Sequence, residues 1–272
     1  MLAHRFDYAA PRRRGELLGI LAERGRAVRL LAGGTDLLVN IRAGLEKPGL
    51  VLDLKKVEDW ERLAWSEAEG LVIGPATTVN ELLQDAVVRE RFPLLAACAH
   101  DLASYQIRNR ATVAGNVVNA SPCSDMAPAL LCLGATARLA SKAGTRELPF
   151  SEFFAGVKTS ALREDEVLER ITVPASAAGA RGDYRKLKRV AGHDLGIVGV
   201  ALARMGGTLR VGISSCAPTP LLVAGLAEDA GPEEVLAAVR ARIKPIDDLR
   251  CSAEYRAFMV ETYVKRLLAE VA

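Results

Sequence analysis

Two glycine-containing segments hold most of the residues in this 272-residue chain that are suited to binding a charged ligand. The first, LAGGTDLL at residues 31–38, predicts a strand that runs through Gly33 and Gly34 into a helix. Glycines let backbone N–H groups approach an anion, and a helix start adds free donors. Thr35 is expected to cap this helix or bind a phosphate, and Asp36 to hold a ribose hydroxyl or favour the helix N-terminus. A plain strand–turn–helix corner explains the segment equally well.

The second segment, TVAGNVVNASPCSD at residues 112–125, gathers hydroxyls, amides and a carboxylate within fourteen residues. Its valines alternate with polar residues, so one face is expected to pack while the other binds. Asp125 is expected in the first turn of the next helix, where the dipole favours a carboxylate. A polar loop with a helix cap is the alternative explanation.

The usual catalytic motifs are absent from the sequence. There is no GxxxxGK[ST], HExxH or GxSxG, and the glycine pair does not extend to GxGxxG. His4, His100 and His193 are far apart and lack the spacing of metal ligands. Glycine-rich loops without an acid–base set are more typical of a protein whose bound cofactor does the chemistry.

Composition excludes several other classes of protein. The net charge of +3 and the 5% aromatic content argue against nucleic-acid or membrane binding. Apolar runs are shorter than the ~18 residues of a spanning helix. No signal peptide is evident, so a cytoplasmic location is expected. The five cysteines are odd in number and lack CxxC spacing, which disfavours a disulfide framework or a zinc or iron–sulfur site.

Hydrophobic periodicity predicts an α+β protein. Residues 206–207 are a Gly-Gly hairpin turn, and residues 174–182 are the best candidate for a linker. Thr78 and Glu81 form a T-x-x-E capping box. Helices are expected at residues 11–25, 36–43, 78–89, 93–100, from 124, 233–242 and 252–269. Strands are expected at residues 27–32, 50–54, 71–74, 135–141, 166–173, 183–190, 197–205 and 208–214.

Together, the two loops resemble the FAD-binding (medium) subunit of molybdenum hydroxylases, a family that includes carbon monoxide dehydrogenase medium subunits and xanthine dehydrogenase flavin domains. The forms typical of that family are close to AGGTDLL and T-[IV]-G-G-N-x-x-x-A-S-P-x-[SA]-D. The loops occur here in the same order, about 80 residues apart. FDYAAP near the start and YRKLKRVAGHD at residues 184–194 extend the resemblance over most of the chain.

The resemblance implies a vanillyl-alcohol oxidase/PCMH-type FAD-binding domain at residues 1–175, with subdomains of about 1–56 and 57–175. A small C-terminal α+β domain, a three-stranded antiparallel sheet plus helices, would follow at residues 176–272. The resemblance also implies which residues bind FAD: Leu31, Ala32, Gly33, Gly34, Thr35, Asp36, Leu37, Leu38, Leu102, Thr112, Val113, Ala114, Gly115, Asn116, Asp125, Leu168 and Lys186. Lys186 would approach N1–C2=O of the flavin, where a cation stabilises the anionic reduced ring; a solvated surface lysine is the alternative.

The chain departs from the family pattern in a few places. Ala114 stands where many relatives have glycine, so a positive φ there would cost ~1 kcal/mol. Leu195 replaces an aromatic residue that some relatives carry near the flavin, and Leu102 also lacks an aromatic face. A cysteine-rich insertion found in relatives that reduce aromatic acyl-CoA thioesters is missing, which disfavours that branch.

The function implied by the resemblance is electron transfer within a complex. Non-covalent FAD would receive electrons from 2Fe–2S clusters on one partner subunit, after substrate oxidation at a molybdopterin site on a large subunit. The resemblance implies that the three subunits assemble as a dimer of heterotrimers. The acceptor would be NAD⁺, a quinone or dioxygen. Two alternatives stay open: a self-sufficient FAD oxidoreductase, and a flavin-free scaffold subunit.

Overall fold

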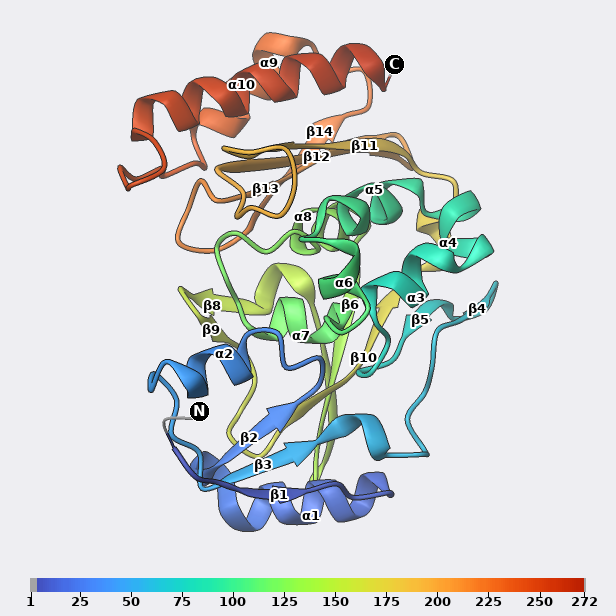
Figure 1. The fold of residues 1–272 in the computed structure, drawn as a ribbon. Helices are drawn as coiled ribbons and strands as arrows, with labels where there is room; N and C mark the ends of the chain where they lie inside the picture. Colours follow the sequence, from blue (N-terminus) through green and yellow to red (C-terminus); the bar gives the residue numbers. More distant parts are fainter. Residues whose placement is uncertain (1–3, 272) are drawn as a thin grey trace.

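The N-terminal segment forms a three-stranded parallel sheet with one helix on its outer face (Figure 1). The computed structural model describes residues 4–271. The predicted helix is confirmed as α1 (Arg14–Arg24), and the predicted strands as β2 (Val28–Leu31) and β3 (Leu50–Asp53). β1 (Asp7–Ala9) pairs with β3 but was not predicted, since three mostly exposed residues give no periodic signal.

A five-stranded antiparallel sheet in the order β4-β5-β10-β6-β7 forms the middle of the molecule. Its strands are β4 (Ala64–Ser66), β5 (Gly70–Ile73), β6 (Thr136–Ser141), β7 (Gly144–Pro149) and β10 (Val167–Val173). A hairpin of β8 (Phe154–Gly156) and β9 (Thr159–Ser160) lies beside it. The apolar pattern of the sequence predicted β5, β6 and β10. The other strands of this sheet and the hairpin were not predicted.

Short helices occupy the chain between β5 and β6. They are α3 (Val79–Gln84), α4 (Ala86–Arg91), α5 (Pro93–Asp101), α6 (Tyr105–Arg108), α7 (Val113–Val118) and α8 (Ala127–Cys132). The capping box of Thr78 and Glu81 is confirmed. The single helix predicted to Arg89 is wrong, because Asp85 adopts an extended conformation, ends α3 and caps α4 by accepting from the Val88 amide.

Three local expectations for the binding loops are also wrong. Thr35 does not cap a helix, since α2 (Leu37–Arg42) begins after Asp36 and has no side-chain cap. The alternating valines belong to α7, in which Val113 and Val117 are buried one helical turn apart. Asp125 precedes α8 rather than lying in its first turn.

The C-terminal part is a four-stranded antiparallel sheet in chain order, not the expected three-stranded one. Its strands are β11 (Arg181–Leu187), β12 (Val198–Met205), β13 (Thr208–Ser214) and β14 (Leu221–Ala227). β14 was missed because Gly225, at a φ of 82°, interrupts its apolar pattern. Gly206 and Gly207 make the predicted hairpin turn with φ values of 57° and 73°.

Helices α9 (Pro232–Arg240) and α10 (Ala253–Glu270) cover the outer face of this sheet, and α5 and α8 pack on its inner face (Figure 1). Tyr184, Ala201 and Ala203 therefore join the hydrophobic core of the middle layer. The segment predicted as a linker contains a 3-10 turn at Ala175–Ala177, with Ala177 fully buried. Within residues 4–271, no helix has the length and apolar character needed to span a bilayer.

Candidate cofactor-binding site

The two predicted loops face one cavity of about 830 Å³. This volume lies within the ~300–1,000 Å³ typical of small-molecule and cofactor sites. Thirteen of the seventeen predicted binding residues line the cavity. The four that do not, among the residues that the structure describes, are Leu31, Leu38, Val113 and Lys186. Leu31 ends β2, Leu38 is exposed, Val113 lies in the core, and Lys186 lies behind Asp125.

Gly33 is required because the first loop touches the backbone of residues 110–111, which lead directly into the second loop. A Cβ atom at Gly33 would lie 2.1 Å from the carbonyl oxygen of Arg110 and 2.8 Å from Cα of Ala111. Gly34 has a φ of 76°, in the left-handed region that favours glycine. The first loop therefore needs one glycine for a close approach and the other for its backbone conformation.

The first loop presents free donors to the cavity. In the described part of the chain, the backbone N–H groups of Gly33, Gly34, Thr35 and Asp36 donate to no protein acceptor. All four residues line the cavity. Since backbone N–H groups need a partner, this arrangement suits an anionic ligand.

Lys55 fixes the position of the first loop. Its Nζ donates to the carbonyl oxygen of Ala32 at 2.8 Å and to the Asp53 carboxylate at 2.7 Å, and Tyr8 also donates to Asp53. Burial raises the pKa of Asp53, but the hydrogen bonds from Lys55 and Tyr8 outweigh it and hold that pKa below its usual value. The carboxylate is thus charged and ties the end of β3 to the loop.

The second loop is ordered by its own side chains. Thr112 caps α7 by accepting from the Gly115 amide at 2.9 Å. Asn116 accepts from the Ser124 hydroxyl at 2.6 Å, which holds the turn before Asp125 against α7. Ala114 lies inside this helix and is not among the described residues with a positive φ, so its methyl group carries no backbone strain.

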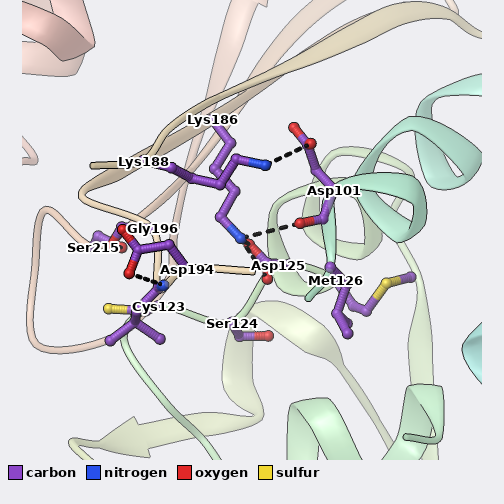
Figure 2. A network of polar contacts seen from close by, with 12 residues as sticks. Asp101, Cys123, Ser124, Asp125, Met126, Lys186, Lys188, Asp194, Gly196 and Ser215 are labelled. Atoms are coloured by element: carbon purple, nitrogen blue, oxygen red, sulfur yellow. Dashed lines mark hydrogen bonds and ion pairs between the residues drawn. The ribbon is translucent and has the colours of Figure 1, made fainter. Parts of the chain in front are cut away.

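Asp125 and Lys186 form a buried ion pair between the middle layer and the C-terminal sheet (Figure 2). Lys186 Nζ lies 2.8 and 2.9 Å from the two carboxylate oxygens, and its side chain is 1% exposed. Tyr184 donates to the same carboxylate at 3.3 Å. Burial raises the pKa of Asp125, and the Lys186 charge only partly offsets this. Lys186 is therefore not the solvated surface lysine of the alternative interpretation.

Part of the cavity lining is aliphatic. Leu102, Leu168 and Leu195 belong to it, and among the described residues the lining includes no Phe, Tyr or Trp side chain. A planar ring in this cavity would thus pack on leucine side chains. Lys158 and His193 also line the cavity but were not predicted to do so. They lie on loops far from the two glycine segments in the sequence, and no motif marks them.

The site is suited to binding rather than to acid–base catalysis. Its lining is rich in backbone amides, hydroxyls and side-chain amides, and three of its four carboxylates are held in ion pairs: Asp125 with Lys186, Glu46 with Arg29 and Asp194 with Arg189. Among residues 4–271, no group of three or more His, Cys, Asp or Glu side chains is arranged to hold a metal ion. A cavity lined by both free amides and leucine side chains fits a ligand that carries a diphosphate and an apolar ring, as FAD does.

Comparison with known proteins agrees with this geometry. Residues 4–176 match the family model of the FAD binding domain in molybdopterin dehydrogenase. The chain is 34% identical to the carbon monoxide dehydrogenase medium chain of Hydrogenophaga pseudoflava, over 98% of this chain and 97% of that protein. It is 28% identical to a putative xanthine dehydrogenase FAD-binding subunit of Escherichia coli K12, over 97% and 96% of the two chains.

The fold agrees as well. A structure of carbon monoxide dehydrogenase from Hydrogenophaga pseudoflava, which lacks the Mo-pyranopterin moiety of its cofactor, superimposes with a TM-score of 0.91 and covers 100% of this chain and 98% of the other. The fold inferred from the two loops is confirmed by this match. The chain belongs to the family of FAD-binding domains of molybdopterin dehydrogenases.

Proposed function

We propose that this chain binds one FAD non-covalently and serves as the electron-transfer subunit of a molybdenum hydroxylase. The observation that carries the proposal is the cavity lined by the two loops, whose lining holds both four free amides and leucine side chains. Bound FAD would supply the reversible two-electron redox chemistry that the side chains of this site lack. Membership of the FAD-binding family supports this assignment.

The residues divide the binding task between them. The amides of residues 33–36 and the start of α7 would hold the diphosphate, while Leu102 and Leu168 would pack on the flavin. Asp125 would accept from a polar group of the cofactor, and Lys186 would act through Asp125 by keeping it charged and in place. The other predicted residues, Leu31, Leu38 and Val113, would support these loops from outside the cavity.

The partners follow from what this chain lacks. Its five cysteines are dispersed and do not have the spacing of an iron–sulfur cluster, so electrons must come from another subunit. We propose a 2Fe–2S subunit and a large molybdopterin-binding subunit as partners, in a dimer of heterotrimers. NAD⁺, a quinone or dioxygen would be the final acceptor. The complex would work in the cytoplasm, where reduced thiols are the rule.

Acid precipitation of the purified yellow protein is expected to release all of its flavin as FAD. The free amides of the first loop suit a diphosphate better than a single phosphate. Among the residues that the structure describes, the cavity lining includes Cys123 and no other cysteine that could attach the flavin covalently. Chromatography of the supernatant and the colour of the pellet are the measurements. FMN in the supernatant, or flavin retained in the pellet, would contradict the proposal; a protein without a flavin band would favour the scaffold alternative.

Affinity purification of the tagged chain from its native host is expected to recover two further subunits together with iron and molybdenum. Mass spectrometry and metal analysis of the eluate are the measurements. An untagged strain serves as the control for proteins that bind the resin. Recovery of the chain alone, with full substrate turnover, would rule out the subunit assignment and favour a self-sufficient flavoenzyme.

A further inference from the structure

The end of α5 and the loop that connects it to α6 are held by cationic side chains from two sides. Arg108 Nη1 donates to the carbonyl oxygen of His100 at 2.8 Å and to that of Leu102 at 2.9 Å. Lys186 Nζ donates to the carbonyl oxygen of Asp101 at 3.2 Å, and Lys188 Nζ lies 3.4 Å from the Asp101 carboxylate (Figure 2). Three consecutive carbonyl groups are thus each bound by a positive charge, and such bonds are stronger than neutral ones.

This loop contains a strained residue. Ala103 has a φ of 46°, in the left-handed region that side chains other than glycine avoid. A non-glycine residue keeps such a conformation only where the surrounding contacts enforce it. The carbonyl group of Leu102, bound by Arg108, is in the peptide unit that immediately precedes Ala103, so this contact acts directly on the strained position.

The strained loop is also part of the cavity wall. Leu102 and Ala103 both line the cavity, whereas Arg108 does not. Arg108 is anchored on the other side, where its Nε donates to the Asn80 side chain at 3.3 Å. Asn80 is buried on α3 and donates to the carbonyl oxygen of Tyr105 at 3.0 Å. The guanidinium therefore connects a rigid helix to the wall without reaching the cavity itself.

We propose that Arg108 is a positioning residue, which holds Leu102 and Ala103 in the strained conformation that shapes the flavin side of the cavity. The proposal rests on the proposed function, because it assigns the wall to FAD. Arginine is suited to the task, since its planar fork binds two carbonyl groups and Asn80 at once, whereas lysine offers a single point donor. Without Arg108, the loop is expected to relax at Ala103 and move Leu102.

The test is FAD titration of the full-length apoprotein and of its Arg108→Gln variant. Loss of a charge-assisted bond predicts that the Kd for FAD rises about tenfold, with a shifted visible band for the bound flavin. Arg108→Lys is expected to recover only part of the affinity. Arg62→Gln, which changes an exposed arginine outside the cavity lining, is the matched control and is expected to leave both readouts unchanged.

A second variant separates positioning from general destabilisation. Glycine adopts a positive φ without strain, so adding Ala103→Gly to Arg108→Gln is expected to restore much of the FAD affinity. No recovery, or wild-type affinity and an unshifted band in Arg108→Gln alone, would overturn the proposal. Hydrogen exchange of residues 101–105 in the apoprotein is expected to be faster in Arg108→Gln than in the wild type. This measurement tests the positioning role of Arg108 without FAD. A wild-type chain that binds no FAD would refute the proposed function separately.

Discussion

Replacing Gly33 by alanine is expected to lower FAD affinity about a hundredfold, since overpacking costs up to ~3 kcal/mol and this energy corresponds to such a factor. The added methyl group would lie 2.1 Å from the Arg110 carbonyl oxygen, a backbone atom that cannot rotate away. The two loops must therefore separate. Their separation moves the free amides of the first loop away from Thr112 and Gly115 of the second.

The measurement is the FAD content per chain after purification, together with the melting temperature. Gly19→Ala is the matched control, because nothing lies within 4 Å of the added Cβ and alanine favours helix α1. That variant is expected to keep a full complement of FAD and to be slightly more stable than the wild type. A Gly33→Ala protein that also keeps its FAD would show that the first loop is wrongly assigned.

Local sequence signals predicted the longer helices and most central strands, and missed short and edge strands such as β1, β4 and β7. The period of Leu17, Leu18 and Leu21 identified α1, and T-x-x-E identified the start of α3. Two other predictions failed because of a single residue. Asp85 divides the predicted helix into α3 and α4. Gly225 interrupts the apolar pattern of β14, which pairs with β13 in the folded chain.

The site was predictable as two loops, but not as a cavity. Gly33 and Gly115 belong to recognisable sequence motifs, and both line the cavity as those motifs predict. The contact between Gly33 and Arg110 joins residues 77 positions apart in the sequence, and no local pattern encodes it. The contacts by which Arg108 holds the loop at Ala103 could not be predicted either. The positive φ of Ala103 and the hydrogen bonds of Arg108 exist only in the folded chain.

The ion pair of Lys186 and Asp125 makes a pH-dependent prediction possible. Burial raises the pKa of Asp125 above the usual 3.8, and Lys186 is the cation that opposes this effect. A carboxyl group with a raised pKa in the folded state stabilises the fold when protonated. Its contribution is complete below 3.8 and is lost as the pH rises through the folded-state pKa. Removing Lys186 raises that pKa further and so widens the range over which stability falls.

Lys186→Met is accordingly expected to lower the free energy of unfolding by ~3–5 kcal/mol at pH 7, because it leaves a buried carboxylate without its cation. The loss should shrink as the pH falls and Asp125 takes up a proton. Urea denaturation of the apoprotein at several pH values is the measurement. Adding Asp125→Asn is expected to recover most of the loss at pH 7 and to remove the pH dependence.

Arg185→Met is the matched control for this variant. It breaks the exposed ion pair with Glu270 on the neighbouring position of the same strand, in which both side chains are more than 40% exposed. Exposed pairs contribute only ~0–1 kcal/mol, so this variant should be close to the wild type at every pH. If Lys186→Met were equally mild, or if its loss were the same at pH 4 and pH 7, Asp125 would not be a carboxylate that depends on Lys186 for its charge. The polar anchor proposed for FAD would then lose its physical basis, because a neutral Asp125 would meet the cofactor as a hydrogen-bond donor rather than as an acceptor.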